Sequence, residues 1–221
     1  MNPCDRCSWN KMVNQKQLTV IFHIDDLMMA HLHSSVVTEH VKLLDEVYGS
    51  QDPLTVSRGK IHVRLGMTIY FSLKVGASFY QYDFISKMWN EMPMELKGKH
   101  RRTPAHEDLF KVDLNSESLD NNKKNTCHHV TAKCLWLSQR TRSDLQLSTG
   151  FHFTRIKSTT FEYWLKFKHA LGYLRSTSFL PMTIAIDKEG NCMVCEDGSH
   201  ATQTQMVKDF RVYLLRWEKV Q

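Results

Sequence analysis

The fold of the first part of this 221-residue chain is decided by the stretch Leu18-Thr19-Val20-Ile21-Phe22-His23-Ile24-Asp25-Asp26-Leu27. Its β-branched and apolar residues predict a strand, and the apolar run at 27–30 predicts a second strand that pairs with it. Asp25 and Asp26 then lie at the bend of a β-hairpin, where both carboxylates are exposed. Hard divalent cations prefer such oxygen ligands. Aspartate is also a common turn residue, so the pair alone leaves open whether the hairpin tip binds a metal.

The sequence on both sides of this hairpin extends a mixed pattern of strands and helices. Upstream, the segment 11–13 is expected to pair with the strand from Gln17 across a polar turn at 14–16. Downstream, Ser34 or Ser35 can cap a helix that ends at Gly49 as its left-handed C′ residue. Apolar residues recur on that helix at helical spacing, at Val37, Val41, Leu44 and Tyr48.

Three further strands are predicted at 60–64, 67–73 and 78–81, with turns at Gly66 and Gly76. From Asp83 the hydrophobic period changes from 2 to 3.6, which predicts helices. Asp83 is expected to cap the first helix, which ends before Pro93. The later helices are expected at 127–139, 143–155 and 160–174, separated from the first by a basic loop at 97–104 and a polar linker at 115–125. A hairpin of strands 182–186 and 191–196 follows, so the predicted fold class is α+β.

The last of these helices has two distinguishing features. Thr159 and Glu162 have the spacing of a capping box, in which each side chain bonds a free amide at the start of the helix. An apolar stripe predicts the face that packs against the core, and it consists of Phe161, Trp164, Leu165, Leu171 and Leu174.

Composition narrows the classes of function. Lys and Arg number 29 against 23 Asp and Glu, a net charge of +6 that permits a polyanionic partner such as nucleic acid. The nine glycines include none of the closely spaced sets that form phosphate-binding loops. No apolar run approaches the ~20 residues needed to span a bilayer, and the first residues lack the apolar stretch of a secretory signal. We therefore expect no membrane association and an intracellular location, in the cytoplasm or the nucleus.

Six cysteines raise the possibility of a zinc site. Cys4 with Cys7 and Cys192 with Cys195 form two C-x-x-C pairs, which could stabilise a zinc-dependent interaction domain. Residues 8–191 lie between the pairs, far more than in a zinc ribbon, so free buried thiols are the favoured interpretation.

Short segments in six places resemble, in order, the Pol polyprotein of copia-type LTR retrotransposons. The stretch 18–27 resembles the Tyr-x-Asp-Asp segment of the reverse transcriptase, although His23 replaces the usual tyrosine. Arg64-Leu65-Gly66-Met67 is similar to the Phe-Leu-Gly-Ile of the primer-grip hairpin, and Thr103-Pro104 to the Thr-Pro after the first thumb helix. The remaining matches are Arg142-Ser143-Asp144-Leu145 with Arg-Pro-Asp-Ile, 168–177 with a helix ending in Tyr-Leu-x-x-Thr, and 197–201 with the start of the RNase H domain.

The resemblance implies an RNA-directed DNA polymerase from a transposable element, which performs two-metal nucleotidyl transfer on an RNA or DNA primer-template. It gives catalytic and metal-binding roles to Asp25 and Asp26, with Mg²⁺ or Mn²⁺ as the cofactor. Asp25 would be the direct ligand and Asp26 would act through the local field. Nucleic-acid contacts would fall to Arg64, Gly66, Lys99, Arg101 and Arg102, and Asp197 would be the remnant of an RNase H carboxylate.

The resemblance also implies an architecture. Residues 1–80 would form the C-terminal part of a polymerase palm with the primer-grip hairpin, 81–176 a helical thumb and connection, and 177–221 a truncated start of an RNase H-like domain. The fingers and the first catalytic aspartate would precede Met1, so we expect the chain alone to be inactive. Its unpaired sheet edge would favour self-association or pairing with that upstream half. A non-catalytic nucleic-acid-binding remnant is the alternative function, and 202–221 has no counterpart in the family.

Overall fold

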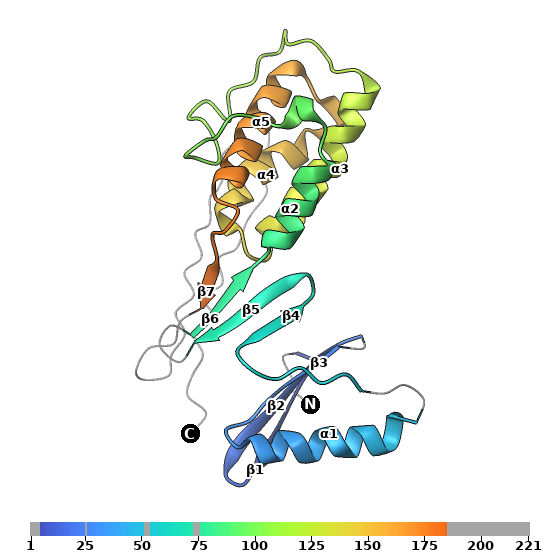
Figure 1. The fold of residues 1–221 in the computed structure, drawn as a ribbon. Helices are drawn as coiled ribbons and strands as arrows, with labels where there is room; N and C mark the ends of the chain where they lie inside the picture. Colours follow the sequence, from blue (N-terminus) through green and yellow to red (C-terminus); the bar gives the residue numbers. More distant parts are fainter. Residues whose placement is uncertain (1–4, 25, 51–53, 73–75, 185–221) are drawn as a thin grey trace. The chain divides into compact units, whose positions relative to one another are not determined.

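The computed structural model describes residues 5–24, 26–50, 54–72 and 76–184, and the chain divides into two compact units, Met1–Gly59 and Lys60–Gln221 (Figure 1). The first contains a three-stranded antiparallel sheet and one helix. The second contains a four-stranded antiparallel sheet and a group of helices. The predicted α+β class is therefore confirmed. The division falls after Gly59, whereas the sequence predicted boundaries at residues 80 and 176.

The sheet of the first unit consists of β1 (Ser8–Val13), β2 (Lys16–His23) and β3 (Asp26–Ala30) in the order β1-β2-β3. The β1–β2 turn holds Asn14 and Gln15 at φ 51° and 61°, the left-handed pair that a tight two-residue hairpin requires. In the second hairpin, His23 is in register with Asp26, and Ile24 follows β2 with a left-handed φ of 55°. Both predicted hairpins are confirmed, but Lys16 and Asp26, which were predicted in the turns, are the first residues of β2 and β3.

Helix α1 (Ser34–Tyr48) follows the sheet, but its ends differ from the prediction. His33 is the N-cap residue and no side chain caps the helix, so the predicted serine cap is wrong. Gly49 has a right-handed φ of −63° and donates its amide to the Asp45 carbonyl, so it is no left-handed C′ residue. Val36 is the buried residue of the helix, whereas the predicted stripe is half-buried at Val37, Val41 and Leu44 and exposed at Tyr48.

The sheet of the second unit contains β4 (Ile61–Arg64), β5 (Met67–Ser72), β6 (Gly76–Tyr80) and β7 (Met182–Ile184), in that order across the sheet. The first three confirm the predicted strands. Leu65 and Gly66 form the β4–β5 turn at φ 51° and 71°, and glycine suits this left-handed position. β7 pairs with β6, with Met182 opposite Phe79. Its predicted hairpin partner, the strand at 191–196, lies outside the described residues.

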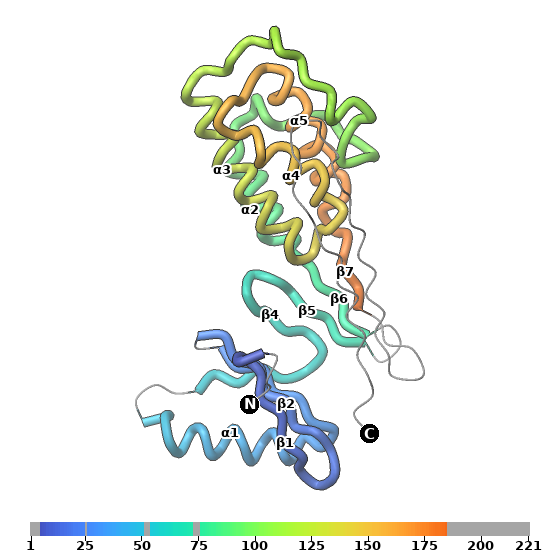
Figure 2. The backbone as a smooth tube through the Cα atoms, turned by 180° about the vertical axis from the view of Figure 1, so that it is seen from behind, coloured from blue at the N-terminus to red at the C-terminus, as the bar shows by residue number. Residues whose placement is uncertain are grey.

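The helices of the second unit lie between β6 and β7 in the sequence, and Figure 2 shows from behind how the chain leaves β6 for α2 and returns from α5 to β7. These helices confirm the prediction that the chain is helical from Asp83 onward. The elements are α2 (Tyr82–Glu91), η1 (Met94–Leu96), α3 (Asn121–Ser138), η2 (Ser143–Leu145), α4 (Gln146–Thr154), η3 (Ile156–Ser158) and α5 (Phe161–Ser176).

Two of these helices begin at residues other than those predicted. α2 has Gln81 as its N-cap residue and Asp83 lies in its first turn. α3 begins at Asn121, inside the segment predicted as a linker, because the Asp120 carboxylate accepts a hydrogen bond from the Lys123 amide at 2.9 Å. The polar composition of 115–125 concealed this capped first turn.

The core of the second unit is formed mainly by α2, α3 and α5. Its fully buried residues include Met88, Leu96, Leu137, Leu171 and Leu174. The predicted stripe on α5 is buried at Trp164, Leu171 and Leu174, but Phe161 and Leu165 are about half exposed.

The predicted capping box at the start of α5 is wrong. Thr160 is the N-cap residue, and Thr159 donates its hydroxyl to the Ile156 carbonyl instead. The Glu162 carboxylate accepts a hydrogen bond from the Asp113 amide and pairs with Lys166 one turn later on α5, so these contacts replace the local motif. Among the described residues, no helix combines the length and apolarity needed to cross a bilayer.

Candidate nucleic-acid interface

The basic loop at 97–104 lies against α5 in the second unit. Two glycines permit this close approach. A Cβ on Gly98 would lie 2.6 Å from the Lys168 carbonyl oxygen, and a Cβ on Gly172 would overlap the Lys99 carbonyl oxygen. Because only hydrogen atoms occupy these positions, the backbone of the loop can contact the backbone of the helix.

Polar contacts fix the same loop to the C-terminal half of α5. The His100 ring Nδ1 lies 2.9 Å from the Ser176 hydroxyl, which also accepts a hydrogen bond from the Arg101 amide at 3.2 Å. Further along the loop, the His169 ring Nε2 lies 3.1 Å from the Thr103 carbonyl oxygen. These contacts hold the loop in one arrangement against α5, and a pre-arranged surface lowers the entropy that binding would have to remove.

Positive charge is concentrated on this loop and the adjoining face of the helix. Lys99, Arg101 and Arg102 are exposed, and α5 adds Lys168 and Arg175. The Arg175 guanidinium lies over the Trp89 ring, 5.0 Å from its centroid, which holds that side chain in place. We call the surface formed by Lys99, Arg101, Arg102, Lys168 and Arg175 the basic ridge.

His169 contributes no charge to the basic ridge near neutral pH. Burial, followed by the nearby Arg101 guanidinium, lowers the pKa of its imidazole. Close by, the His106 ring and the Asp108 carboxylate are 2.8 Å apart. The hydrogen bond from His106 lowers the pKa of Asp108, so that carboxylate is already partnered.

The structure thus brings together three of the five residues predicted to contact nucleic acid, namely Lys99, Arg101 and Arg102. Arg64 and Gly66 lie on a different element, the β4–β5 hairpin. Arg64 is half-buried opposite Met67, and Gly66 is exposed in the turn.

The predicted metal site at the β2–β3 tip is described in part. Asp25 lies outside the described residues, as does Asp197. Asp26 is exposed at the first position of β3, and the preceding Ile24 has a left-handed φ of 55°. A single exposed carboxylate suits a hard cation that keeps most of its water ligands. Within the described ranges, no group of three or more His, Cys, Asp or Glu side chains is arranged to hold a metal ion.

The cysteines are placed only in part. Cys127 and Cys134 are buried free thiols, and burial raises the pKa of each to about 12, so both stay protonated. Cys7 is exposed, while its predicted zinc partners Cys4, Cys192 and Cys195 lie outside the described residues.

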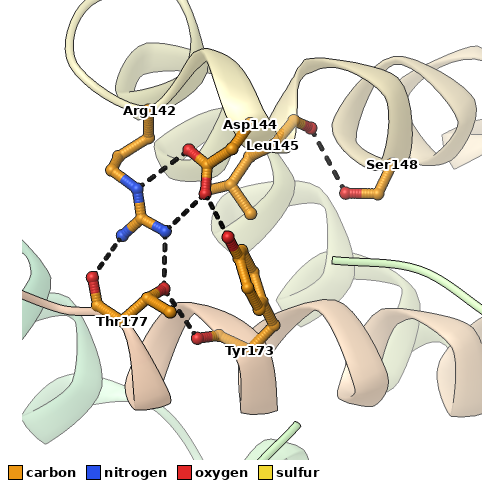
Figure 3. A network of polar contacts seen from close by, with 6 residues as sticks. All are labelled: Arg142, Asp144, Leu145, Ser148, Tyr173 and Thr177. Atoms are coloured by element: carbon orange, nitrogen blue, oxygen red, sulfur yellow. Dashed lines mark hydrogen bonds and ion pairs between the residues drawn. The ribbon is translucent and has the colours of Figure 1, made fainter. Parts of the chain in front are cut away.

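A buried ion-pair network joins two of the segments that resemble the Pol polyprotein (Figure 3). Arg142 is 1% exposed, and its Nε and Nη2 donate to the two Asp144 carboxylate oxygens at 3.0 and 2.8 Å. The same guanidinium donates to the Thr177 carbonyl and hydroxyl oxygens. The Tyr173 hydroxyl donates to Asp144 at 2.7 Å. The network fastens the end of α5 to η2.

Charge pairing within this network determines the state of Asp144. Burial alone would raise the pKa of this carboxyl, but the hydrogen bonds from Arg142 and Tyr173 outweigh it, and the pKa is lowered. The carboxylate is therefore ionised opposite a buried guanidinium. The sequence resemblance marked both segments but gave no sign that they bind each other.

Sequence reasoning also missed a buried polar residue in the helical core. His152 on α4 is 6% exposed and is surrounded by the rings of Phe151, Tyr163 and Phe167. Burial, and then the positive charge of Lys166, lower the pKa of His152 to about 3. A histidine between two phenylalanines in the sequence was the available signal.

Comparison of the chain with protein-family models, curated proteins and solved structures finds no match.

Proposed function

We propose that this chain is part of a copia-type retrotransposon reverse transcriptase, and that its second unit binds the RNA or DNA primer-template. The observation that carries the proposal is the basic ridge, where the loop that carries Lys99, Arg101 and Arg102 packs against the helix that carries Lys168 and Arg175. Phosphate contacts by Lys and Arg supply most of the affinity in sequence-independent nucleic-acid binding. A surface that is already ordered suits such binding.

The buried network supports the family assignment. Arg142 and Asp144 belong to one segment that resembles the Pol polyprotein, and Tyr173 and Thr177 belong to another. These segments bind each other through hydrogen bonds between residues 29 and 35 positions apart. Two short resemblances that meet in one buried contact support each other more than two isolated matches would.

The polymerase part of the proposal concerns the first unit. In this proposal the first unit and the β4–β5 hairpin are parts of a polymerase palm, and the β2–β3 tip presents Asp25 and Asp26 to Mg²⁺ or Mn²⁺. The exposed position of Asp26 at a hairpin tip supports this assignment. Two-metal transfer needs a further carboxylate besides Asp25 and Asp26, and the resemblance matches no other residue of this chain to that role. We therefore expect the chain alone to bind primer-template without extending it.

The binding proposal is tested by fluorescence anisotropy with a labelled RNA–DNA primer-template over a range of salt concentrations. The variant Lys99→Gln/Arg101→Gln/Arg102→Gln should bind more weakly, and its salt slope should fall by about 1 for each phosphate that is no longer neutralised. The matched control Lys11→Gln/Lys16→Gln/Lys42→Gln removes the same charge from exposed positions of the first unit. Equal losses of affinity in both variants would show that net charge, and not the basic ridge, determines binding.

Nucleotide incorporation and metal content separate the competing functions. Incorporation by the chain alone with Mg²⁺ or Mn²⁺ would contradict the expected inactivity and establish an enzyme. Binding without incorporation fits either a polymerase segment or a non-catalytic remnant. Mn²⁺ titration then distinguishes these two, because Asp25→Asn should weaken Mn²⁺ binding more than Asp26→Asn only where the metal site persists. Stoichiometric zinc in the purified chain would instead favour the zinc-stabilised interaction domain.

A further inference from the structure

A small polar cavity lies in the helical core of the second unit, away from the basic ridge. Its volume is about 10 Å³. Residues of α3, α4 and α5 enclose it together with the η3 segment. The polar or ionisable residues that line it are Cys127, Thr131, His152, Arg155, Thr159 and Tyr163.

One buried polar atom on the cavity wall, Nε2 of His152, makes no hydrogen bond to a described residue. The buried hydroxyl of Tyr163 accepts a hydrogen bond from the Arg155 side chain, and its own proton remains to be donated. The rings of His152 and Tyr163 lie 6.3 Å apart between centroids, and both residues line the cavity. Because buried polar groups in folded proteins nearly always have a hydrogen-bond partner, the unpartnered His152 Nε2 indicates a ligand in the cavity, to which the Tyr163 hydroxyl can donate its proton.

The size and charge of the cavity define that ligand. A volume of about 10 Å³ is near the minimum that holds one water molecule and excludes a phosphate or an organic molecule. The wall carries the Arg155 guanidinium and no carboxylate, so it repels cations. The Cys127 thiol stays protonated, because burial raises its pKa to about 12. The ligand must therefore be no larger than a water molecule, carry no positive charge and be able to form hydrogen bonds.

We propose that this cavity binds one internal water molecule that bridges His152 Nε2 and the Tyr163 hydroxyl. This water links α4 to α5 at the point where the two helices meet the η3 segment. It extends the polar contacts of the helical core to a histidine whose Nε2 has no partner among the described residues. The site is structural and is independent of the proposed nucleic-acid binding.

The test is a crystal structure of the full chain at a resolution that shows ordered water, together with ¹⁷O relaxation dispersion in solution. We expect a water oxygen within hydrogen-bond distance of both His152 Nε2 and the Tyr163 hydroxyl. Tyr163→Phe and His152→Leu should each remove one long-lived water from the relaxation signal. The control His129→Gln, at an exposed position of α3, should retain it.

Several outcomes would overturn the proposal. These are a protein atom bonded to His152 Nε2, a chloride ion in the cavity, or a dry cavity in the wild-type crystal. If His152→Leu does not fold, Tyr163→Phe still decides, because it removes a single hydroxyl and keeps the ring. Retention of the long-lived water in Tyr163→Phe would exclude the hydroxyl as a partner and contradict the proposed bridge.

Discussion

The first unit and the helical part of the second unit differ sharply in how they bury apolar side chains. Among the described residues of the first unit, the buried apolar side chains are Leu18 and Val36. The exposed large apolar residues of the same unit include Met12, Ile24, Leu27, Leu32 and Leu43. In the second unit, three helices enclose a continuous core that contains Met88, Trp164 and Leu171.

This difference shows that a clear sequence pattern does not measure stability. Both regions have regular hydrophobic periods, but burial of apolar area, at about 25 cal/mol per Å², offsets the entropy of ordering the chain. The first unit has little such burial. We therefore expect it to unfold before the second unit, and its exposed apolar side chains to favour association with another surface.

The largest effect that would sharpen this comparison is expected from Arg142→Ala. Removing this guanidinium leaves Asp144 as a half-buried charge without its partner and frees two Thr177 acceptors, which should cost about 3–5 kcal/mol. Hydrogen exchange followed by mass spectrometry should show reduced protection in α5 and η2 with little change in β1–β3. The control Arg102→Ala, at an exposed position, should change stability by less than ~0.5 kcal/mol. Equal loss of protection in both units would contradict their independence.

Acid should act mainly on the second unit, through His152. The pKa of His152 is lowered from 6.5 to about 3, so the unfolded chain binds the proton more tightly than the folded chain. Stability is therefore fully present above pH 6.5 and is lost progressively as the pH falls toward 3. Protonation of this group alone should remove about 3 kcal/mol by pH 4.

Urea titrations of the second unit between pH 7 and pH 4 measure this loss. The variant His152→Phe should have a flatter dependence on pH. Part of the dependence should persist, because Asp144 also has a lowered pKa and loses its pairing in acid. A wild-type curve and a variant curve of the same slope would exclude His152 as the acid-sensitive group.

A smaller effect is expected from two glycines of the second unit. In Gly172→Ala, the new methyl group overlaps the Lys99 carbonyl oxygen, so the basic loop should shift away from α5 at a cost of about 1–3 kcal/mol. Binding to primer-template should weaken with it. Gly150→Ala is the matched control, because its Cβ would meet nothing within 4 Å on α4 and should stabilise that helix by up to ~1 kcal/mol. If Gly172→Ala binds primer-template as tightly as the wild type, the position of the basic loop on α5 does not determine binding.

The smallest effect is expected in the first unit, at Ile24. This β-branched residue has a left-handed φ of 55° and is 92% exposed, so it is strained without compensating burial. Ile24→Asn should stabilise the first unit by about 1 kcal/mol, since asparagine tolerates this conformation. The control Ile21→Asn, within β2, should destabilise the same unit. Thermal unfolding followed by hydrogen exchange at β2 and β3 measures both changes. If Ile24→Asn destabilises the first unit, the backbone at Ile24 is not strained.

Local patterns in the sequence predicted most of the elements but not the contacts between them. Alternation and turn residues located the hairpins around 14–16 and 25–26, and the period of 3.6 located the helices from Asp83 onward. The start of α3 was missed because Asp120 caps it inside a polar stretch with no apolar period. The capping box at Thr159 was predicted wrongly because Asp113 and Lys166, from outside that motif, bind Glu162.

For the candidate site, the sequence predicted only which residues it contains and not how they are arranged. The basic character of 97–104 is visible in the sequence, and so are Gly98 and Gly172. That these glycines lie against opposing backbones depends on the packing of a loop on a helix more than sixty residues away, which no local pattern encodes. Arg142 and Thr177 are likewise separated in the sequence and meet only in the folded chain.

The pairing of β6 with β7 makes the helical segment an insertion in a sheet. Phe79 lies opposite Met182, so the chain enters the helices and leaves them at adjacent points of neighbouring strands. A short turn could therefore join Tyr80 to Pro181, and residues 81–180 could be transplanted into another hairpin with both ends already at the correct spacing. The same arrangement ties the helices to the sheet by two strands in place of one, which restricts their rotation about either connection.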